Sequence, residues 1–170
     1  MFGAVWHEDG ARDLILRAKW QGDRAALLVL ADLIGESCGP AACAAAGLAF
    51  VPDGWCAVPR DPWRWLRRGT PLSERLGVEI GRRTGLPRLP PPRRKWRPPQ
   101  TSRTGAARRS NLAGAFAYPR RSQRKVRGKR VVIIDDVATT GSTLEQCARA
   151  LTEAGAASVA AWVVALVRHR

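Results

Sequence analysis

The amino-acid sequence predicts an α/β domain with a central, mostly parallel sheet flanked by helices. Two observations near the end of the chain support this prediction. Residues Arg130–Ile134 form a run rich in β-branched side chains, which is typical of a parallel strand buried on both faces. A helical pattern over Ser142–Ala154 and a second apolar strand over Ser158–Val167 follow. The order strand, loop, helix, strand predicts a right-handed βαβ unit.

The remaining elements are predicted from shorter patterns. Strands are expected at Ala4–Trp6, Trp55–Val58 and Ala115–Tyr118, and helices at Gly10–Trp20, Arg24–Gly35, Pro40–Gly47 and Pro71–Gly85. Asp23 is placed to cap the helix that begins at Arg24, and Gly155 lies where the end of a helix favours a left-handed residue. Ser122–Arg130 is expected to be a turn. The length of 170 residues fits one domain over 1–170.

The positive charge of the chain is concentrated in one segment. The net charge is +15, and residues 82–130 contain 17 Lys or Arg and no Asp or Glu, whereas the rest of the chain has 12 basic and 14 acidic residues. Consecutive prolines in Leu86–Gln100 exclude a helix or a central strand and leave a loop or an edge strand. Since Thr101–Asn111 is small, polar and basic, we expect a flexible basic loop over 86–113. Such a segment suits an anionic partner, either nucleic acid or a polyphosphate ligand.

Composition also limits the class of protein. No apolar run is long enough to cross a bilayer, and the N-terminus lacks the pattern of a secretory signal. We therefore expect a cytoplasmic protein without membrane insertion. The cysteines Cys38, Cys43, Cys56 and Cys147 form no CxxC pair and have no nearby histidine. We expect buried thiols and no zinc.

The segment Val131–Thr143, VVIIDDVATTGST, is where ligand chemistry is expected. It follows the carboxyl end of the predicted buried strand, where open α/β sheets bind ligands. Asp135 and Asp136 are expected to begin the loop and to point to opposite sides of an extended chain. Two adjacent carboxylates repel, and either vicinal sugar hydroxyls or a divalent cation would compensate them.

The second half of this segment is suited to a phosphate group. Small residues and hydroxyls lead to a helix N-terminus, whose amides and dipole favour an anion, and Gly141 lets the backbone approach a ligand closely. The alternative is a plain surface loop in which Ser142 or Thr143 caps the helix. The predicted ribose-5-phosphate site comprises Asp135, Asp136, Val137, Ala138, Thr139, Thr140, Gly141, Ser142 and Thr143.

The segment Val131–Thr143 resembles the phosphoribosyl pyrophosphate (PRPP) motif of type I phosphoribosyltransferases. The order of further motifs resembles the ComF family, a competence-associated branch of these proteins. The segments that carry this resemblance are Ala18–Asp23 (AKWQGD), Ala57–Pro59 (AVP), Arg67–Gly69 (RRG), Pro99–Thr101 (PQT) and Arg109–Phe116 (RSNLAGAF). Two features differ from the family pattern: the sequence lacks the usual four-cysteine zinc ribbon, and Thr70-Pro71 replace an aromatic residue and an asparagine.

The resemblance implies a type I phosphoribosyltransferase fold and transfer of ribose-5-phosphate from PRPP to a nitrogen acceptor, releasing pyrophosphate. It implies Mg²⁺ as the cofactor, held by Asp135 and Asp136 directly or through the ribose or water. It also implies basic residues that neutralise the pyrophosphate and close a hood over the site. The basic residues expected in this role are Arg60, Arg68, Lys95, Arg97, Arg103 and Arg109.

The acceptor and the occurrence of turnover stay open at this stage. Purine transferases often place a carboxylate in the phosphate loop, and this sequence has Thr139 and Thr140 there. A second hypothesis is therefore a binding module without turnover. In that case the loop binds PRPP or a nucleotide, while the basic insert contacts single-stranded DNA or the DNA-uptake machinery. A homodimer is compatible with both hypotheses.

Overall fold

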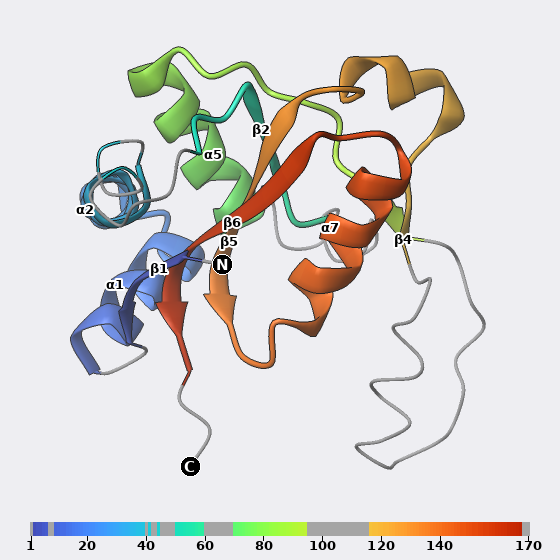
Figure 1. Cartoon of the computed structure of the whole chain (residues 1–170). Helices are drawn as coiled ribbons and strands as arrows, with labels where there is room; N and C mark the ends of the chain where they lie inside the picture. Colours follow the sequence, from blue (N-terminus) through green and yellow to red (C-terminus); the bar gives the residue numbers. More distant parts are fainter. Residues whose placement is uncertain are drawn as a thin grey trace, which may run out of the picture.

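Four parallel strands form a sheet in the order β1-β6-β5-β2 (Figure 1). The computed structural model of the chain describes residues 2–6, 9–39, 41, 44, 50–59, 70–94 and 116–167, without the side chains of residues 2–6, 9 and 38. The strands are β1 (Phe2–Trp6), β2 (Gly54–Ala57), β5 (Arg130–Ala138) and β6 (Ser158–Leu166). The α/β fold class and the parallel sheet are confirmed.

The β-branched run lies in the middle of this sheet, as expected. β5 pairs with β6 along its whole length, from Arg130 opposite Ser158 to Ala138 opposite Leu166. Its other edge pairs with β2, with Val131 opposite Gly54. Val131 and Val132 are fully buried on opposite faces of the strand, because helices cover both sides.

Helices cover the two faces of the sheet unequally. α7 (Ser142–Glu153) packs on one face through Leu144, Cys147 and Leu151. The other face is covered by α1 (Asp9–Trp20), α2 (Arg24–Cys38) and α5 (Leu72–Thr84) (Figure 1). Gly155 ends α7 with φ +93°, as its position predicts. The helix expected at Pro40–Gly47 lies mostly outside the described residues.

The proline-rich segment pairs with the edge of the sheet at Arg88, which confirms the edge-strand alternative of its prediction. The Leu89 N–H donates to the Trp55 carbonyl at 2.7 Å, and the Trp55 N–H donates to the Pro87 carbonyl at 3.0 Å. This segment thus extends the edge of the sheet beside β2, and Leu89 is buried in the core. It continues into a short antiparallel pair of β3 (Arg93–Arg94) and β4 (Phe116–Ala117). The rest of the basic loop, residues 95–113, lies outside the described residues.

The segment after β4 corrects one prediction. The turn expected at Ser122–Arg130 contains a 3₁₀ helix, η1 (Arg120–Lys125), before the turn that leads into β5. The Gly128 N–H donates to the Gly155 carbonyl at 2.8 Å. η1 therefore lies at the end of the sheet where α7 finishes, opposite the end where α7 begins (Figure 1).

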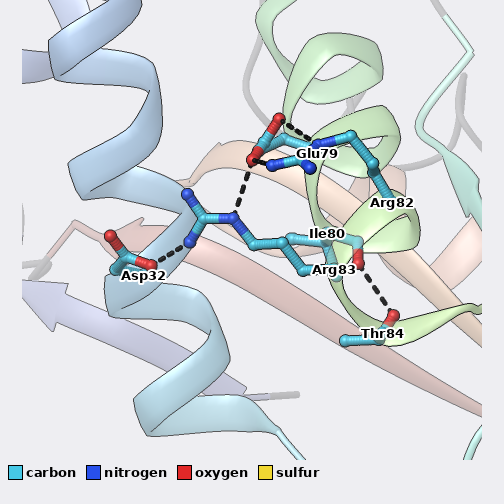
Figure 2. Close-up of polar contacts among 6 residues, drawn as sticks. All are labelled: Asp32, Glu79, Ile80, Arg82, Arg83 and Thr84. Atoms are coloured by element: carbon cyan, nitrogen blue, oxygen red, sulfur yellow. Dashed lines mark hydrogen bonds and ion pairs between the residues drawn. The ribbon is translucent and has the colours of Figure 1, made fainter.

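Ion pairs join the helices on the side away from α7. Arg83 of α5 bonds the Glu79 carboxylate at 2.7 Å and also reaches Asp32 on α2, as Figure 2 shows. Arg82 adds a second guanidinium to Glu79 at 2.8 Å. These hydrogen bonds from Arg82 and Arg83 lower the pKa of Glu79 to about 2. The Thr84 hydroxyl donates to the Ile80 carbonyl at 2.8 Å and tightens the end of α5.

Candidate functional site

The acidic pair belongs to strand β5 and not to the loop that follows it. The sequence predicts that the strand ends at Ile134, whereas β5 continues to Ala138. Asp135 and Asp136 are therefore 9% and 4% exposed. The correction has a simple cause: β6 supplies pairing partners as far as Leu166, so the backbone stays extended past the acids.

The two carboxylates point to opposite faces of the sheet, as the strand geometry requires. Asp135 faces α7, where its charge adds to burial and to Cys56 in raising the pKa of the Cys147 thiol. Asp136 faces α1, where it contacts Lys19. Each carboxylate also accepts a hydrogen bond from the next backbone amide: Asp136 N–H to Asp135 Oδ1 at 2.9 Å, and Val137 N–H to Asp136 Oδ1 at 3.1 Å. These bonds fix the orientation of both side chains.

Lys19 is a site residue that the sequence reasoning did not assign. Its Nζ lies 2.9 Å from Asp136 Oδ2, across a separation of 117 residues. The same ammonium lies 5.9 Å from the ring centroid of Trp20. Lys19 belongs to the AKWQGD segment, one of the segments that resemble the ComF family. No spacing or periodicity relates it to Asp136, because the contact depends on how α1 packs on the sheet.

The corner between α1 and α2 is braced around Lys19. Arg17 pairs with Asp23 at 2.6 Å, and Asp23 caps α2 by accepting the Ala26 N–H at 3.1 Å. The hydrogen bonds from Ala26 and then from Arg17 lower the pKa of Asp23. Arg75 on α5 donates to the Ala18 carbonyl at 2.5 Å. The predicted cap at Asp23 is confirmed, and this network holds the last turn of α1 beside the sheet.

The loop after β5 is short and exposed. Thr139 and Thr140 are exposed, and Gly141 has φ +71° and occupies the N-cap position of α7 without a side-chain cap. The Thr140 and Ser142 hydroxyl oxygens are 2.8 Å apart, and the Ser142 N–H is 3.4 Å from the Thr140 hydroxyl. The alternative prediction that Ser142 or Thr143 caps the helix is wrong, because Ser142 is the first residue of α7 and Gly141 is its N-cap.

Two predicted site residues have their side chains in the core. Ala138 is 4% exposed and packs on the α7 side, whereas Val137 packs against the cluster on the α1 side. Any contact that they make with a ligand would therefore come from the backbone. The Ala138 carbonyl accepts the Val167 N–H at 3.0 Å, which fixes the point where the loop leaves the sheet.

The basic residues predicted to bind pyrophosphate are not placed. Arg60, Arg68, Lys95, Arg97, Arg103 and Arg109 all lie outside the described residues. Their assignment stays a prediction that rests on the family resemblance.

The described ranges lack both a cluster of metal ligands and a membrane-spanning helix. These ranges contain no group of three or more His, Cys, Asp or Glu side chains able to hold a metal ion. Cys56 and Cys147 are free and buried, and burial raises the pKa of Cys56 to about 12. None of the helices in the part of the chain that is described is long and apolar enough to cross a membrane.

Known proteins resemble this chain in sequence and in fold. Residues 93–170 match the family described as "Phosphoribosyl transferase domain". "Competence protein F" of Haemophilus influenzae is 31% identical over 117 residues, which are 68% of this chain and 51% of that protein. "DNA utilization protein YhgH" of Escherichia coli O157:H7 is 34% identical over 122 residues, covering 66% of this chain and 48% of that protein. The chain spans about half the length of the curated relatives it matches.

A solved structure shares the fold at low sequence identity. The glutamine phosphoribosylpyrophosphate (PRPP) amidotransferase from B. subtilis, complexed with ADP and GMP, matches 88% of this chain and 30% of its own chain, with a TM-score of 0.50 and 18% identity. The likeness agrees with the parallel sheet described above. Taken with the two curated relatives and the family match, it shows that the chain is a ComF-like protein with the type I phosphoribosyltransferase fold.

Proposed function

We propose that the chain binds PRPP and, with Mg²⁺, transfers ribose-5-phosphate from PRPP to a nitrogen acceptor with release of pyrophosphate. The observation that carries this proposal is the buried pair Asp135 and Asp136, which lies directly before an exposed loop and the uncapped start of α7. Carboxylates accept hydrogen bonds from sugar hydroxyls. The backbone N–H groups at the start of a helix donate hydrogen bonds to a phosphate.

Different residues would bind the ribose and the 5-phosphate of PRPP. Asp135 and Asp136 would accept hydrogen bonds from the two ribose hydroxyls, since both carboxylates are oriented by backbone amides before any ligand arrives. The segment Thr139–Thr143 would hold the 5-phosphate with its hydroxyls and amides. Gly141, with φ +71°, gives the backbone its turn into α7, in a conformation that favours glycine.

Mg²⁺ fits this donor set only together with the ligand. Since Asp135 and Asp136 point to opposite faces of the sheet, one carboxylate at most would contact a given ion, and Mg²⁺ in phosphate sites takes its remaining ligands from phosphates and water. When bound, Mg²⁺ would neutralise charge on the departing pyrophosphate. The described residues would hold the ribose and its 5-phosphate in place while the bond between the ribose and the pyrophosphate breaks and the acceptor nitrogen bonds to the ribose.

The experiment separates binding from turnover. The melting temperature of the purified protein is measured with PRPP and Mg²⁺. In a separate assay, native protein is incubated with PRPP, Mg²⁺ and a panel of nitrogenous bases and amines while pyrophosphate release is followed. We expect a higher melting temperature, which is lost in Asp135→Asn and in Asp136→Asn. Asp53→Asn is the matched control, because Asp53 forms an ion pair with Arg130 at the opposite end of β5. An unchanged melting temperature in the wild type would refute the site.

A second candidate function is contact with single-stranded DNA without turnover. The observation in its favour is the basic surface on η1 and the following turn, which faces solvent at the far end of α7 from the loop (Figure 1). The exposed side chains of this surface are Arg120, Arg121, Arg124, Lys125 and Arg127. Binding through phosphates weakens steeply with salt.

DNA binding is tested by reversing charges on η1, away from the loop after β5. We expect Arg121→Glu with Arg124→Glu to weaken binding of single-stranded DNA and to reduce its salt dependence, while Asp136→Asn has no effect on it. Salt-independent binding, or binding that Asp136→Asn abolishes, would exclude this surface as the contact. The names of the curated relatives motivate this test, and a role in DNA uptake is proposed on the same ground.

A further inference from the structure

We propose that Lys19 is a built-in counter-cation of the acidic pair, which disfavours a free divalent cation at Asp136 and favours an anionic ligand beside it. The part of this proposal that concerns PRPP rests on the proposed function. Lys19 would then be a positioning residue that sets which charge the site accepts.

Lys19 and Asp136 form a close, partly buried ion pair. Lys19 Nζ lies 2.9 Å from Asp136 Oδ2, and the Asp136 side chain is 5% exposed while that of Lys19 is 27% exposed. The pair is thus screened from bulk water on the carboxylate side and reaches solvent on the ammonium side. A cation placed in this way occupies one oxygen of Asp136, the oxygen that does not accept the Val137 N–H.

Lys19 is held in place by more than this single ion pair. It lies in the last turn of α1, where the negative end of the helix dipole favours a cation. The Trp20 ring lies beside its ammonium, which adds a cation–π contact. The Arg75 hydrogen bond to the Ala18 carbonyl fixes the preceding residue. The ammonium is therefore positioned before any ligand binds.

The charge of Lys19 affects cations and anions at the site in opposite ways. Lys19 adds one positive charge directly beside the Asp136 carboxylate. A unit charge a few ångströms away, at the effective dielectric near a protein surface, changes a binding constant by about tenfold or more. The sign of this change is opposite for a cation and for an anion. Lys19 should therefore weaken the binding of free Mg²⁺ and strengthen the binding of PRPP.

Opposite signs distinguish this role from a merely structural one. A lysine that only ties α1 to β5 would, when removed, loosen the site for every ligand. The test compares Lys19→Met, Lys19→Gln and Lys19→Arg with the wild type in the full chain. Gln keeps a donor for Asp136 without the charge, so it also serves if the Met variant does not fold. Arg keeps the charge.

The matched control removes a similar ion pair elsewhere on the same sheet. Arg130 bonds Asp53 with its side chain at 3.0 Å and joins the start of β5 to the residue before β2. Arg130→Met removes a cation from a partly buried carboxylate at the opposite end of the strand, so it should leave both ligand affinities unchanged.

Calorimetry on metal-free protein at constant ionic strength measures two ligands separately: Mg²⁺ alone, and PRPP without Mg²⁺. We expect about tenfold tighter Mg²⁺ binding in Lys19→Met and Lys19→Gln, with weaker PRPP binding, and wild-type behaviour in Lys19→Arg. The Mg²⁺ arm decides the proposal by itself. Unchanged, weaker or undetectable Mg²⁺ binding in both uncharged variants overturns it.

Failure of the proposed function gives a different result. In that case the wild type shows no PRPP-dependent rise in melting temperature, and Asp136→Asn changes nothing. The effect of Lys19 on Mg²⁺ affinity is still measured under those conditions.

Discussion

The indole of Trp55 lies directly against the backbone of Gly77. A Cβ atom at Gly77 would be 2.1 Å from Trp55 Cζ3, and one at Gly81 would be 2.5 Å from Trp55 Nε1. These glycines are one turn apart on α5, so together they form the flat strip on which the Trp55 ring of β2 rests. Because β2 pairs with β5, this contact helps to set the position of the strand that carries the acidic pair.

Gly77→Ala is expected to destabilise the protein by about 1–3 kcal/mol, the usual cost of overpacking a filled core. Urea unfolding measures this change. Gly35→Ala on α2 is the matched control, because a Cβ at Gly35 meets nothing within 4 Å. Removing a helical glycine there should stabilise the protein by about 0.5–1 kcal/mol. Equal effects of the two substitutions would contradict the packing described for Trp55.

Acid should unfold the protein partly through Asp53 and Glu79. Hydrogen bonds from Arg130 lower the pKa of Asp53 to about 2, and Arg82 and Arg83 lower the pKa of Glu79 to about 2. Both carboxyls bind protons more weakly in the folded state than their usual values of 3.8 and 4.5. Their stabilising contribution is therefore complete above about pH 4.5 and is lost as the pH falls toward 2.

Melting temperatures measured from pH 6 down to pH 2 test this pH dependence. Asp53→Asn and Glu79→Gln should each lower the melting temperature at pH 6 and should each make its fall with acid less steep. Asp13→Asn is the control, because Asp13 is largely exposed and lies 3.9 Å from its partner Arg17. A parallel shift of the whole curve in the Asp53 and Glu79 variants would show that their pKa values are not lowered by folding.

Gly141→Ala should weaken ligand binding beyond its effect on stability. Gly141 has φ +71°, and an L-residue in this conformation costs about 1–2 kcal/mol. Gly85→Ala makes a matched comparison, because Gly85 has φ +73° at the far end of α5. Both variants should lose similar stability in urea. Only Gly141→Ala should lower the PRPP-induced rise in melting temperature, and a loss in both would argue against the loop as the binding site.

The thiols of Cys56 and Cys147 should be unreactive in the folded protein. Burial raises the pKa of both groups, that of Cys56 to about 12, so neither forms the reactive thiolate at pH 8. A Cys38→Ser, Cys43→Ser variant leaves these two as the only thiols. We expect no reaction with a disulfide reagent until urea unfolds the chain, followed by two thiols per chain. Rapid labelling without denaturant would show that α7 opens easily from the sheet.

The strand-helix-strand unit could be predicted because its signals are local. A β-branched run, a helix of amphipathic period and a glycine at its end each follow from neighbouring residues, and β5, α7 and β6 occupy the predicted places within a few residues. The end of β5 was missed by four residues. The extension of β5 depends on how far β6 pairs with it, and the residues around Asp135 carry no information about that pairing.

The sequence by itself determined the α/β class, the acidic pair and the small-residue loop after it, since these depend on residue type and local spacing. The tertiary structure decided that Asp135 and Asp136 are buried in a strand, that Gly141 and not Ser142 is the N-cap of α7, and that Lys19 forms an ion pair with Asp136. The reason is that burial and ion pairing depend on which distant elements pack together. The position of α1 against β5 is fixed by the core on that face and by the corner around Asp23.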